Sequence, residues 1–448
     1  MWDRLRSIWT IPDLRKKILF TIAMLLIFRI LAHITVPLTG AEQTALANIF
    51  KGTGSNQNLG QLLGLLDVFS GGSLQQFSIV ALGVYPYITA TIVMQLLQPI
   101  IPALENMLRE GEAGRLRFSQ LTRIISVPLA FLQALGQTAI FVKAGVLSSS
   151  SFNLFDPNVA LQSFAILISL TAGTMILVWI GELITENGIG NGISLIIFGG
   201  IVSRIPGLIQ SGYTASTTSS GNGSGIISIA VFLIIGLITI IGIVYVYQGQ
   251  RRVPIEYPTK RMVGRGMLVG TAQRTYIPMQ VNSAGMIPLI FAQSMLIFPA
   301  VLSTYLATSS TSWLANVSNF IGSYIVNTSL WYYWLIYFFL VVAFTYFYAY
   351  VVWQQQNIPD NLQKQGAHIP GYRPGETTRR HLNDILNRIT LAGALFLGIV
   401  AILPFFAKVG GNQLLSSAAL LIVVGVVLDT VRQIEAQMVM RNYSGFLT

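Results

Sequence analysis

Ten long apolar segments constrain this chain more than any other feature. Each runs for about 20 residues, the length that an α-helix needs to cross the hydrocarbon core of a bilayer. Only 10% of the 448 residues are charged and 53% are hydrophobic, whereas a soluble domain usually carries about 25% charged residues. The sequence therefore predicts an all-α polytopic membrane protein with ten transmembrane helices. The segments are Ile18–Val36, Phe77–Leu97, Ile124–Val142, Phe164–Ile184, Ile193–Ile209, Ile226–Tyr247, Ala284–Leu306, Trp331–Trp353, Ile385–Phe406 and Leu414–Val431.

The basic residues alternate between successive connections. Arginine and lysine cluster before the first segment and in the second-to-third, sixth-to-seventh and eighth-to-ninth connections, while the intervening connections contain few. Because basic loops stay in the cytoplasm, both termini are expected there, and an even number of spans agrees. Residues 1–17 form a basic amphipathic start without a signal-peptide cleavage pattern, so the first span is expected to remain as an anchor.

An uncharged polar stretch, 210–225, divides the spans five and five. Residues 18–209 then form an N-terminal half, residues 226–437 a C-terminal half, and residues 438–448 a cytoplasmic tail. Two inverted halves of this kind occur in many membrane carriers.

Two large basic loops, about 248–281 and 354–384, lie on the cytoplasmic side of the second half. Each is either an ordinary loop that obeys the positive-inside rule or a docking surface for an acidic or nucleic-acid partner. The residues alone leave both interpretations open.

The second apolar segment is broken where a simple anchor would be continuous. Gly71 and Gly72 lie just before it, and Gly83 and Pro86 lie within it. At membrane depth such backbone is tolerated only where protein or a water-filled cavity covers it, so this segment is expected to line something. Two pairs of apolar residues four positions apart would each share a helix face, although on spacing alone ordinary helix packing or lipid contact is the better explanation. The pairs are Val84 with Ile88 and Ile193 with Ile197.

Candidate catalytic groups are scarce. The chain has no cysteine, and its three histidines form no metal-binding pattern. Arg29 lies within the first apolar span, and Asp429 is three residues from Arg432 near the end of the tenth; a structural pair or snorkelling is expected for these charges. Arg204 lies near the end of the short fifth span, which is expected to adapt by snorkelling or by local thinning of the bilayer. We therefore predict no enzyme activity, no cofactor and no metal site. An ion-coupled solute carrier stays open as an alternative, although no span has an acidic residue near its middle to serve as a relay.

Several long stretches, in order along the chain, resemble the SecY family, the channel subunits of the bacterial Sec protein translocase. The resemblance extends from about residue 14 to residue 438. The stretches are FSGGSLQQFSIVALGVYPYITATIVMQLL (69–97), WIGELITENGIGNGISLIIF (179–198), QGQRRVPIEYPTK, VNSAGMIPLIFAQSMLIFP, DNLQKQGAHIPGYRPGETT and LLIVVGVVLDT.

The resemblance implies a central hourglass pore between two inverted five-helix halves. A short plug helix, about 62–76, would close the pore from outside with Leu66 and Phe69, and Gly71 and Gly72 would form its hinge. A ring of apolar side chains would gate the pore by dewetting. At the first ring position this chain has Val84 in place of the isoleucine that the resemblance implies. The ring residues would be Val84, Ile88, Ile193, Ile197, Ile290 and Ile422.

The resemblance also implies the activity and the partners. The channel would pass unfolded preproteins across the membrane and release hydrophobic segments laterally into lipid, through a gate that includes Gln95 and Asn282. Arg251, Arg252 and Arg373 would dock the SecA ATPase or the ribosome. SecE would be an obligate partner and SecG a peripheral one, and signal peptides and membrane lipids would also bind. The expected location is a bacterial plasma membrane, with a thylakoid or other organellar membrane as the alternative.

Overall fold

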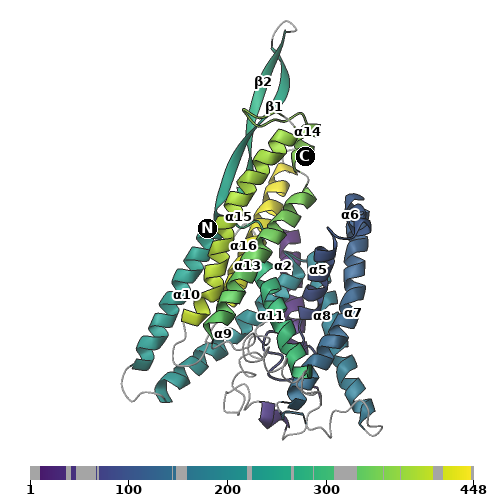
Figure 1. Cartoon of the computed structure of the whole chain (residues 1–448), viewed down its shortest axis with the longest axis vertical. Helices are drawn as coiled ribbons and strands as arrows, with labels where there is room; N and C mark the ends of the chain where they lie inside the picture. Colours follow the sequence, from purple (N-terminus) through teal and green to yellow (C-terminus); the bar gives the residue numbers. More distant parts are fainter. Residues whose placement is uncertain are drawn as a thin grey trace. The chain divides into compact units, whose positions relative to one another are not determined.

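The structure is a computed structural model of the whole chain (Figure 1), in which the chain divides into two compact units. The first unit is Met1–Ile229 with Ser294–Tyr333 and Val409–Thr448, and the second is Ala230–Gln293 with Trp334–Lys408. The described residues are 11–36, 42–46, 67, 70–143, 145–147, 159–218, 224–263, 267–285, 287–306, 330–356, 358–373, 375–406 and 417–444.

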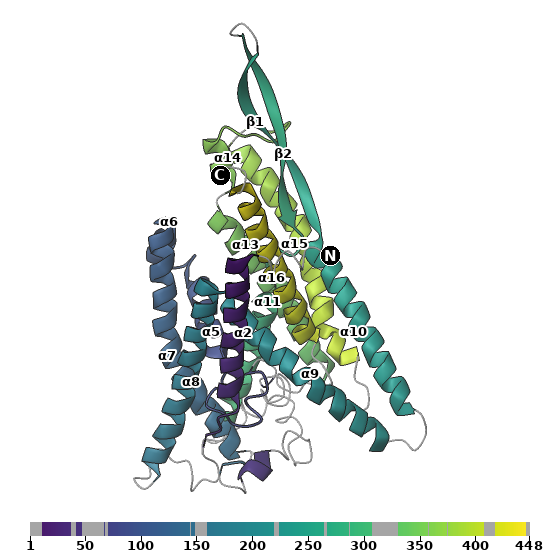
Figure 2. The ribbon, with the colours of Figure 1, turned by 180° about the vertical axis from the view of Figure 1, so that it is seen from behind.

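The first unit is a bundle of helices. Within it α5 packs on α7, α7 on α8, and α8 on α9, while α2 lies against both α8 and α9 (Figure 2). The C-terminal helix α16 joins this unit through α9. The bounds are α2 Pro12–Ala32, α5 Tyr85–Leu97, α6 Pro102–Arg109, α7 Glu112–Lys143, α8 Ala160–Asn187, α9 Gly192–Thr218 and α16 Ser417–Ser444.

The second unit combines helices with a long β-hairpin. Strands β1 (Gln250–Val263) and β2 (Met267–Gln280) pair antiparallel, from Gln250 opposite Gln280 to Val263 opposite Met267. The basic loop 248–281 is therefore a hairpin, a conformation that the sequence analysis did not anticipate. The helices are α10 Ser224–Gln248, α13 Trp331–Gln356, α14 Ile358–Lys364 and α15 Glu376–Phe406, while α11, Ile287–Leu306, contributes to both units.

Among the described residues, four helices are long and apolar enough to cross a membrane, and a fifth span results if α5 and α6, bent by 104°, count as one. This supports a polytopic membrane protein whose spans are α-helical. Two of the ten predicted spans, Ala284–Leu306 and Leu414–Val431, include residues outside the described ranges, and the number ten stays a prediction.

The second predicted span differs from the structure at its beginning. Helix α5 begins at Tyr85, eight residues later than the predicted start, and residues 71–84 form turns instead. Two causes are visible. Pro86 occupies the first turn of α5, where its missing N–H costs no hydrogen bond. The chain before it pairs with the end of the first span through a Thr35–Ser78 bridge.

Candidate functional site

The plug segment, our name for the predicted plug at about 62–76, is held in the first unit by a buried carboxylate. Asp67 is 0% exposed, and its Oδ2 lies 2.7 Å from Nη1 of Arg204 on α9. Its Oδ1 accepts hydrogen bonds from the backbone N–H groups of Leu74, at 3.0 Å, and Gln75, at 3.2 Å. Burial raises the pKa of the Asp67 carboxyl, while the Arg204 guanidinium and these hydrogen bonds lower it. The carboxylate thus joins the plug segment to α9.

The two predicted hinge glycines both have a left-handed backbone. Gly71 has φ +69° and Gly72 has φ +86°, a region that glycine enters without strain. Gly71 also touches α9 closely, because a Cβ on Gly71 would lie 2.5 Å from Cα of Gly200. Its carbonyl oxygen accepts a hydrogen bond of 3.1 Å from Nη1 of Arg29 on α2. The predicted need for unusual backbone angles is confirmed, while the hinge motion itself stays a prediction.

The structure gives new roles to the two arginines of the apolar spans. Arg29 has an internal partner, the Gly71 carbonyl, which is one of the two alternatives that the sequence left open. Snorkelling was one of the two adaptations expected of the short span that contains Arg204; instead, the Arg204 side chain is only 16% exposed and meets Asp67. Charges inside a membrane protein usually pair, so an acidic residue in the otherwise uncharged plug segment was the available signal. Leu66 and Phe69 of the plug segment lie outside the described residues.

The predicted ring residues are largely buried. Within the first unit, Val84 is the N-cap residue of α5, and its carbonyl accepts the backbone N–H of Ile88. Ile193 and Ile197 lie on α9 and Ile422 on α16, and these two helices pack together. The sixth residue, Ile290, belongs to α11 in the second unit, where it is 5% exposed. Their convergence into a ring stays a prediction.

Both predicted lateral-gate residues contain an unsatisfied buried acceptor. Gln95 lies on α5 and Asn282 in the turn before α11. Asn282 donates through its Nδ2 to the carbonyl of Gly285 at 3.1 Å. Within the described part of the chain, however, Oε1 of Gln95 and Oδ1 of Asn282 accept no hydrogen bond. Such groups cost free energy until they find a donor.

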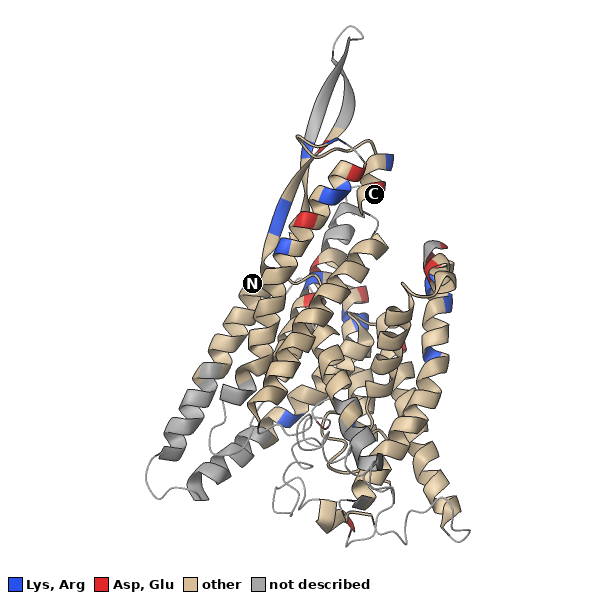
Figure 3. Ribbon diagram, viewed as in Figure 1, with Lys and Arg blue, Asp and Glu red and all other residues tan. Residues whose placement is uncertain are grey.

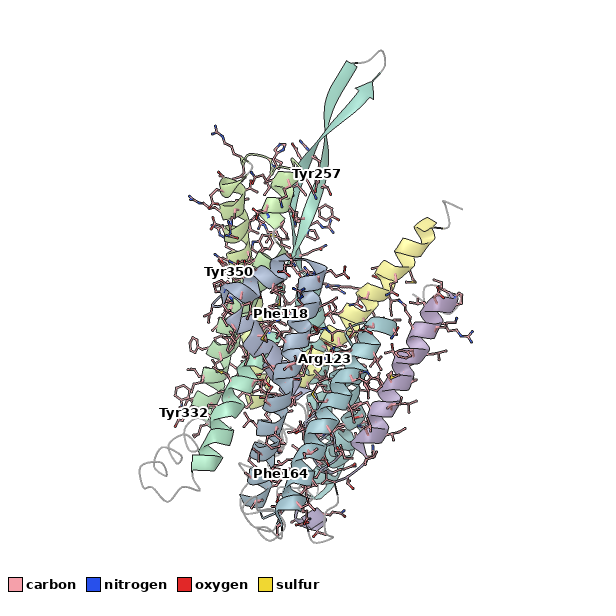
Figure 4. All side chains as sticks on the ribbon, turned by 90° about the vertical axis from the view of Figure 1, so that its right-hand side faces the viewer. Phe118, Arg123, Phe164, Tyr257, Tyr332 and Tyr350 are labelled. Atoms are coloured by element: carbon pink, nitrogen blue, oxygen red, sulfur yellow. The ribbon has the colours of Figure 1, made fainter. Side chains whose placement is uncertain are left out.

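In the second unit, the hairpin and the second basic loop form one body. Glu256 on β1 and His368 exchange two backbone hydrogen bonds, of 2.9 and 3.0 Å, and Tyr257 (labelled in Figure 4) donates to Oε1 of Gln365 at 3.2 Å. An apolar core fixes this docking platform, our name for β1, β2, α14, the loop 365–375 and the start of α15. The core residues are Val253, Ile255, Met279, Trp353, Leu362, Ala367, Ile369, Leu382, Ile385 and Leu386.

The three predicted docking arginines are exposed on this platform. Arg251 and Arg252 lie on β1, and the Arg252 guanidinium stacks over the Tyr276 ring at 4.9 Å. Arg373 lies in the loop before α15, where its carbonyl accepts the Thr378 hydroxyl at 2.8 Å. Figure 3 shows further basic residues on β2 and α15 of this unit. Thus the structure joins into one surface the two loops that the sequence presented separately.

Comparison with known proteins identifies the family. The SecY family model matches residues 78–431. The chain belongs to the SecY family. The protein translocase subunit SecY of Mycobacterium bovis is 40% identical over 445 residues, which cover 97% of each chain. The SecY subunit of Thermotoga maritima is 38% identical over 451 residues, covering 100% of this chain and 98% of its relative.

Solved structures agree with the fold. A structure titled as that of a protein conducting channel matches with a TM-score of 0.58 and 19% identity, over 95% of this chain and 93% of the other. A structure on how the plug domain of SecY stabilises the closed channel matches with a TM-score of 0.59 and 18% identity, over 95% and 92% of the two chains. At these identities the likeness shows the fold alone.

Family membership decides between the functions that the sequence left open. Relatives that span the whole chain are translocase channel subunits, so this chain is a protein-conducting membrane channel of the Sec type. It is neither an enzyme nor a solute carrier.

Proposed function

We propose that this channel passes unfolded preproteins across a bacterial plasma membrane, with both of its termini in the cytoplasm, and releases hydrophobic segments sideways into lipid. The anchored plug segment is the observation that carries this proposal. A buried acidic residue and two glycines in left-handed conformations fit the segment against α2 and α9. A segment held this way is able to close a pathway and to leave it as a unit.

The second part of the seal is the apolar ring of Val84, Ile88, Ile193, Ile197, Ile290 and Ile422. Aliphatic side chains have no charge that would hold ions and no fixed hydrogen bonds that would demand one passenger sequence. Such a constriction excludes water when empty and yields around a passing chain. Burial of Val84, Ile197, Ile290 and Ile422, each at most 5% exposed, agrees with a closed state.

Lateral release is assigned to a seam that includes Gln95 and Asn282. Each has a buried acceptor without a donor among the described residues, and an unsatisfied acceptor lowers the cost of separating the surface that contains it. The same acceptors are available to a signal peptide that enters the seam.

The docking platform is assigned to the partner that drives translocation, either the SecA ATPase or a ribosome. Arg251, Arg252 and Arg373 present guanidinium groups on a rigid base, an arrangement suited to carboxylates and phosphates. A ribosome fits this surface electrostatically, and a structural relative, Sec61, was solved within a canine ribosome–channel complex, with a TM-score of 0.55 and 19% identity. SecE is assigned as the obligate membrane partner and SecG as a peripheral one.

The seal is tested with vesicles that contain the chain together with SecE. Native vesicles should import a preprotein when SecA and ATP are added, and they should leak few ions at rest. Ile290→Asn and Ile422→Asn should raise the leak or admit preproteins with defective signals. Val427→Asn is the matched control, because Val427 lies on the same helix as Ile422 but is 43% exposed. Normal import with unchanged leak in both variants would remove the ring assignment.

Docking is tested by Arg373→Ala, with Lys364→Ala as the matched control of an exposed basic residue on the same platform. Arg373→Ala should impair import while the resting leak stays at the native level, since the substitution lies outside the pore. Lys364→Ala should import almost normally. Equal import by the two variants would contradict the role assigned to Arg373.

A further inference from the structure

We infer, on the basis of the proposed channel function, that Asp67 and Arg204 form an ionic latch whose strength determines how readily the plug segment leaves its closed position. The two residues would thereby set how strong a signal must be to open the channel.

Three of the plug segment's contacts with α2 and α9 differ in kind. Gly71 touches Gly200 through van der Waals contact, and Arg29 donates to a backbone carbonyl. Only the contact between Asp67 and Arg204 joins two full charges. An ion pair in a site of low dielectric constant is strong while it is intact, and it is costly to break because each charge then remains without a partner.

The two partners are unequally buried, so the loss of one should weaken the closed state more than the loss of the other. The Asp67 side chain is 0% exposed and the Arg204 side chain 16%. The carboxylate therefore depends on its partner more than the guanidinium does. If Arg204 is removed, Asp67 either takes up a proton and stays buried as the neutral acid or keeps its charge and regains hydration by moving out with the plug segment, and both changes weaken the closed state. If Asp67 is removed, Arg204 has a long flexible stem with which to reach water.

The geometry of Asp67 also ties the latch to the shape of the segment. Its Oδ1 accepts the Leu74 and Gln75 N–H groups, while its Oδ2 faces Arg204. A single carboxylate thus folds the turn after Gly72 and docks that turn onto α9. Opening has to separate the charges while the turn keeps its hydrogen bonds, so the free energy of opening should follow the charge pair rather than the local fold.

The test uses a reporter of plug position in the full chain, reconstituted with SecE. Because the sequence has no cysteine, Ser70→Cys introduces a single thiol next to the latch, at a position that is 3% exposed. The Ser70 hydroxyl donates to Oδ1 of Asp67 at 3.3 Å, so every comparison is made within the Ser70→Cys background, where the loss of this bond is common to all variants. The rate of its reaction with a membrane-impermeant maleimide, applied from the plug side, reports departure of the segment. Ion leak of the same vesicles is recorded in parallel, without SecA or ATP.

Three variants are compared in the Ser70→Cys background. Arg204→Gln should raise the labelling rate about a hundred-fold, the scale expected when one partner of a buried pair is lost. Asp67→Asn should raise it less, because Arg204, the less buried of the two partners, remains. The double variant should label more slowly than Arg204→Gln alone, since it leaves no unpaired charge. Arg117→Gln is the matched control, because it breaks an exposed pair with Glu110 and should change nothing.

A labelling rate that is unchanged in Arg204→Gln would overturn the latch, as would a double variant whose effect equals the sum of the two single effects. These readouts do not depend on transport. If the latch variants behave as expected but the native vesicles import no preprotein under conditions where a control translocase works, the proposed function fails and the latch stands. If import is normal but the labelling rate does not respond to the latch variants, the latch fails and the proposed function stands.

Discussion

Gly200→Ala gives a sharp test of how the plug segment is seated. Gly200 lies within α9, and a Cβ placed there would be 2.7 Å from Cα and 3.3 Å from N of Gly71. Both are backbone atoms, so no side-chain rotation relieves the clash. The plug segment has to move by at least about 0.7 Å before the first of these contacts reaches an ordinary 3.4 Å.

The size of the effect follows from this overlap. Overpacking by one methyl group costs about 1–3 kcal/mol, and the closed state bears this cost because the methyl group meets open space once the segment leaves. The open population should therefore rise about 5- to 150-fold. Resting ion leak and the labelling rate of the Ser70→Cys reporter should rise together.

Gly207→Ala is the matched control on the same helix. A Cβ at Gly207 meets nothing within 4 Å, and both substitutions gain about 1 kcal/mol of helix propensity, so their difference isolates the contact with Gly71. Equal leak in the Gly200→Ala and Gly207→Ala variants would refute the close packing of the plug segment against α9.

Three further predictions concern the second unit. Leu382→Ala should destabilise the docking platform by about 2–5 kcal/mol, because Leu382 is 0% exposed in its core; faster hydrogen exchange at the base of β1 and β2 would show it. Gly393→Ala places a methyl group against the carbonyl of Val281, so preprotein import should fall while ion leak stays low. Gly242→Ala is its control and should behave as native, because the nearest contact of the added methyl group is at 3.9 Å. Trp353→Phe removes a 3.0 Å indole hydrogen bond to α15 and should lower stability by about 1 kcal/mol, measured by denaturant unfolding of the purified chain.

Much of the architecture follows from local sequence. Long apolar stretches form helices in a membrane because the backbone has to satisfy its own hydrogen bonds there. The class of protein could therefore be predicted from composition and from the length of these stretches. The need for glycine at Gly71 and Gly72 could be predicted in the same way, since the break in the apolar pattern marks it. The exposed positions of Arg251, Arg252 and Arg373 follow from the positive-inside rule and from the turn formers around them.

The start of α5 could not be placed from hydrophobicity. Phe77 and its neighbours are as apolar as a helix interior, but the turn from 71 to 84 pairs with the end of the first span, and Phe77 packs against Phe141 with ring centroids 5.1 Å apart. These partners are distant in sequence, and apolar composition says only that a segment is buried, not which partner buries it.

The sequence by itself determined that this chain is a helical membrane protein with a broken second span and two large basic loops, because composition and spacing act locally. Only the tertiary structure decided that Arg204 meets Asp67, that Gly200 faces Gly71, and that the hairpin and the loop around His368 form one platform. The physical reason is that a charge in an apolar environment has to find an opposite charge, but which one lies within reach is fixed by how helices far apart in the chain cross.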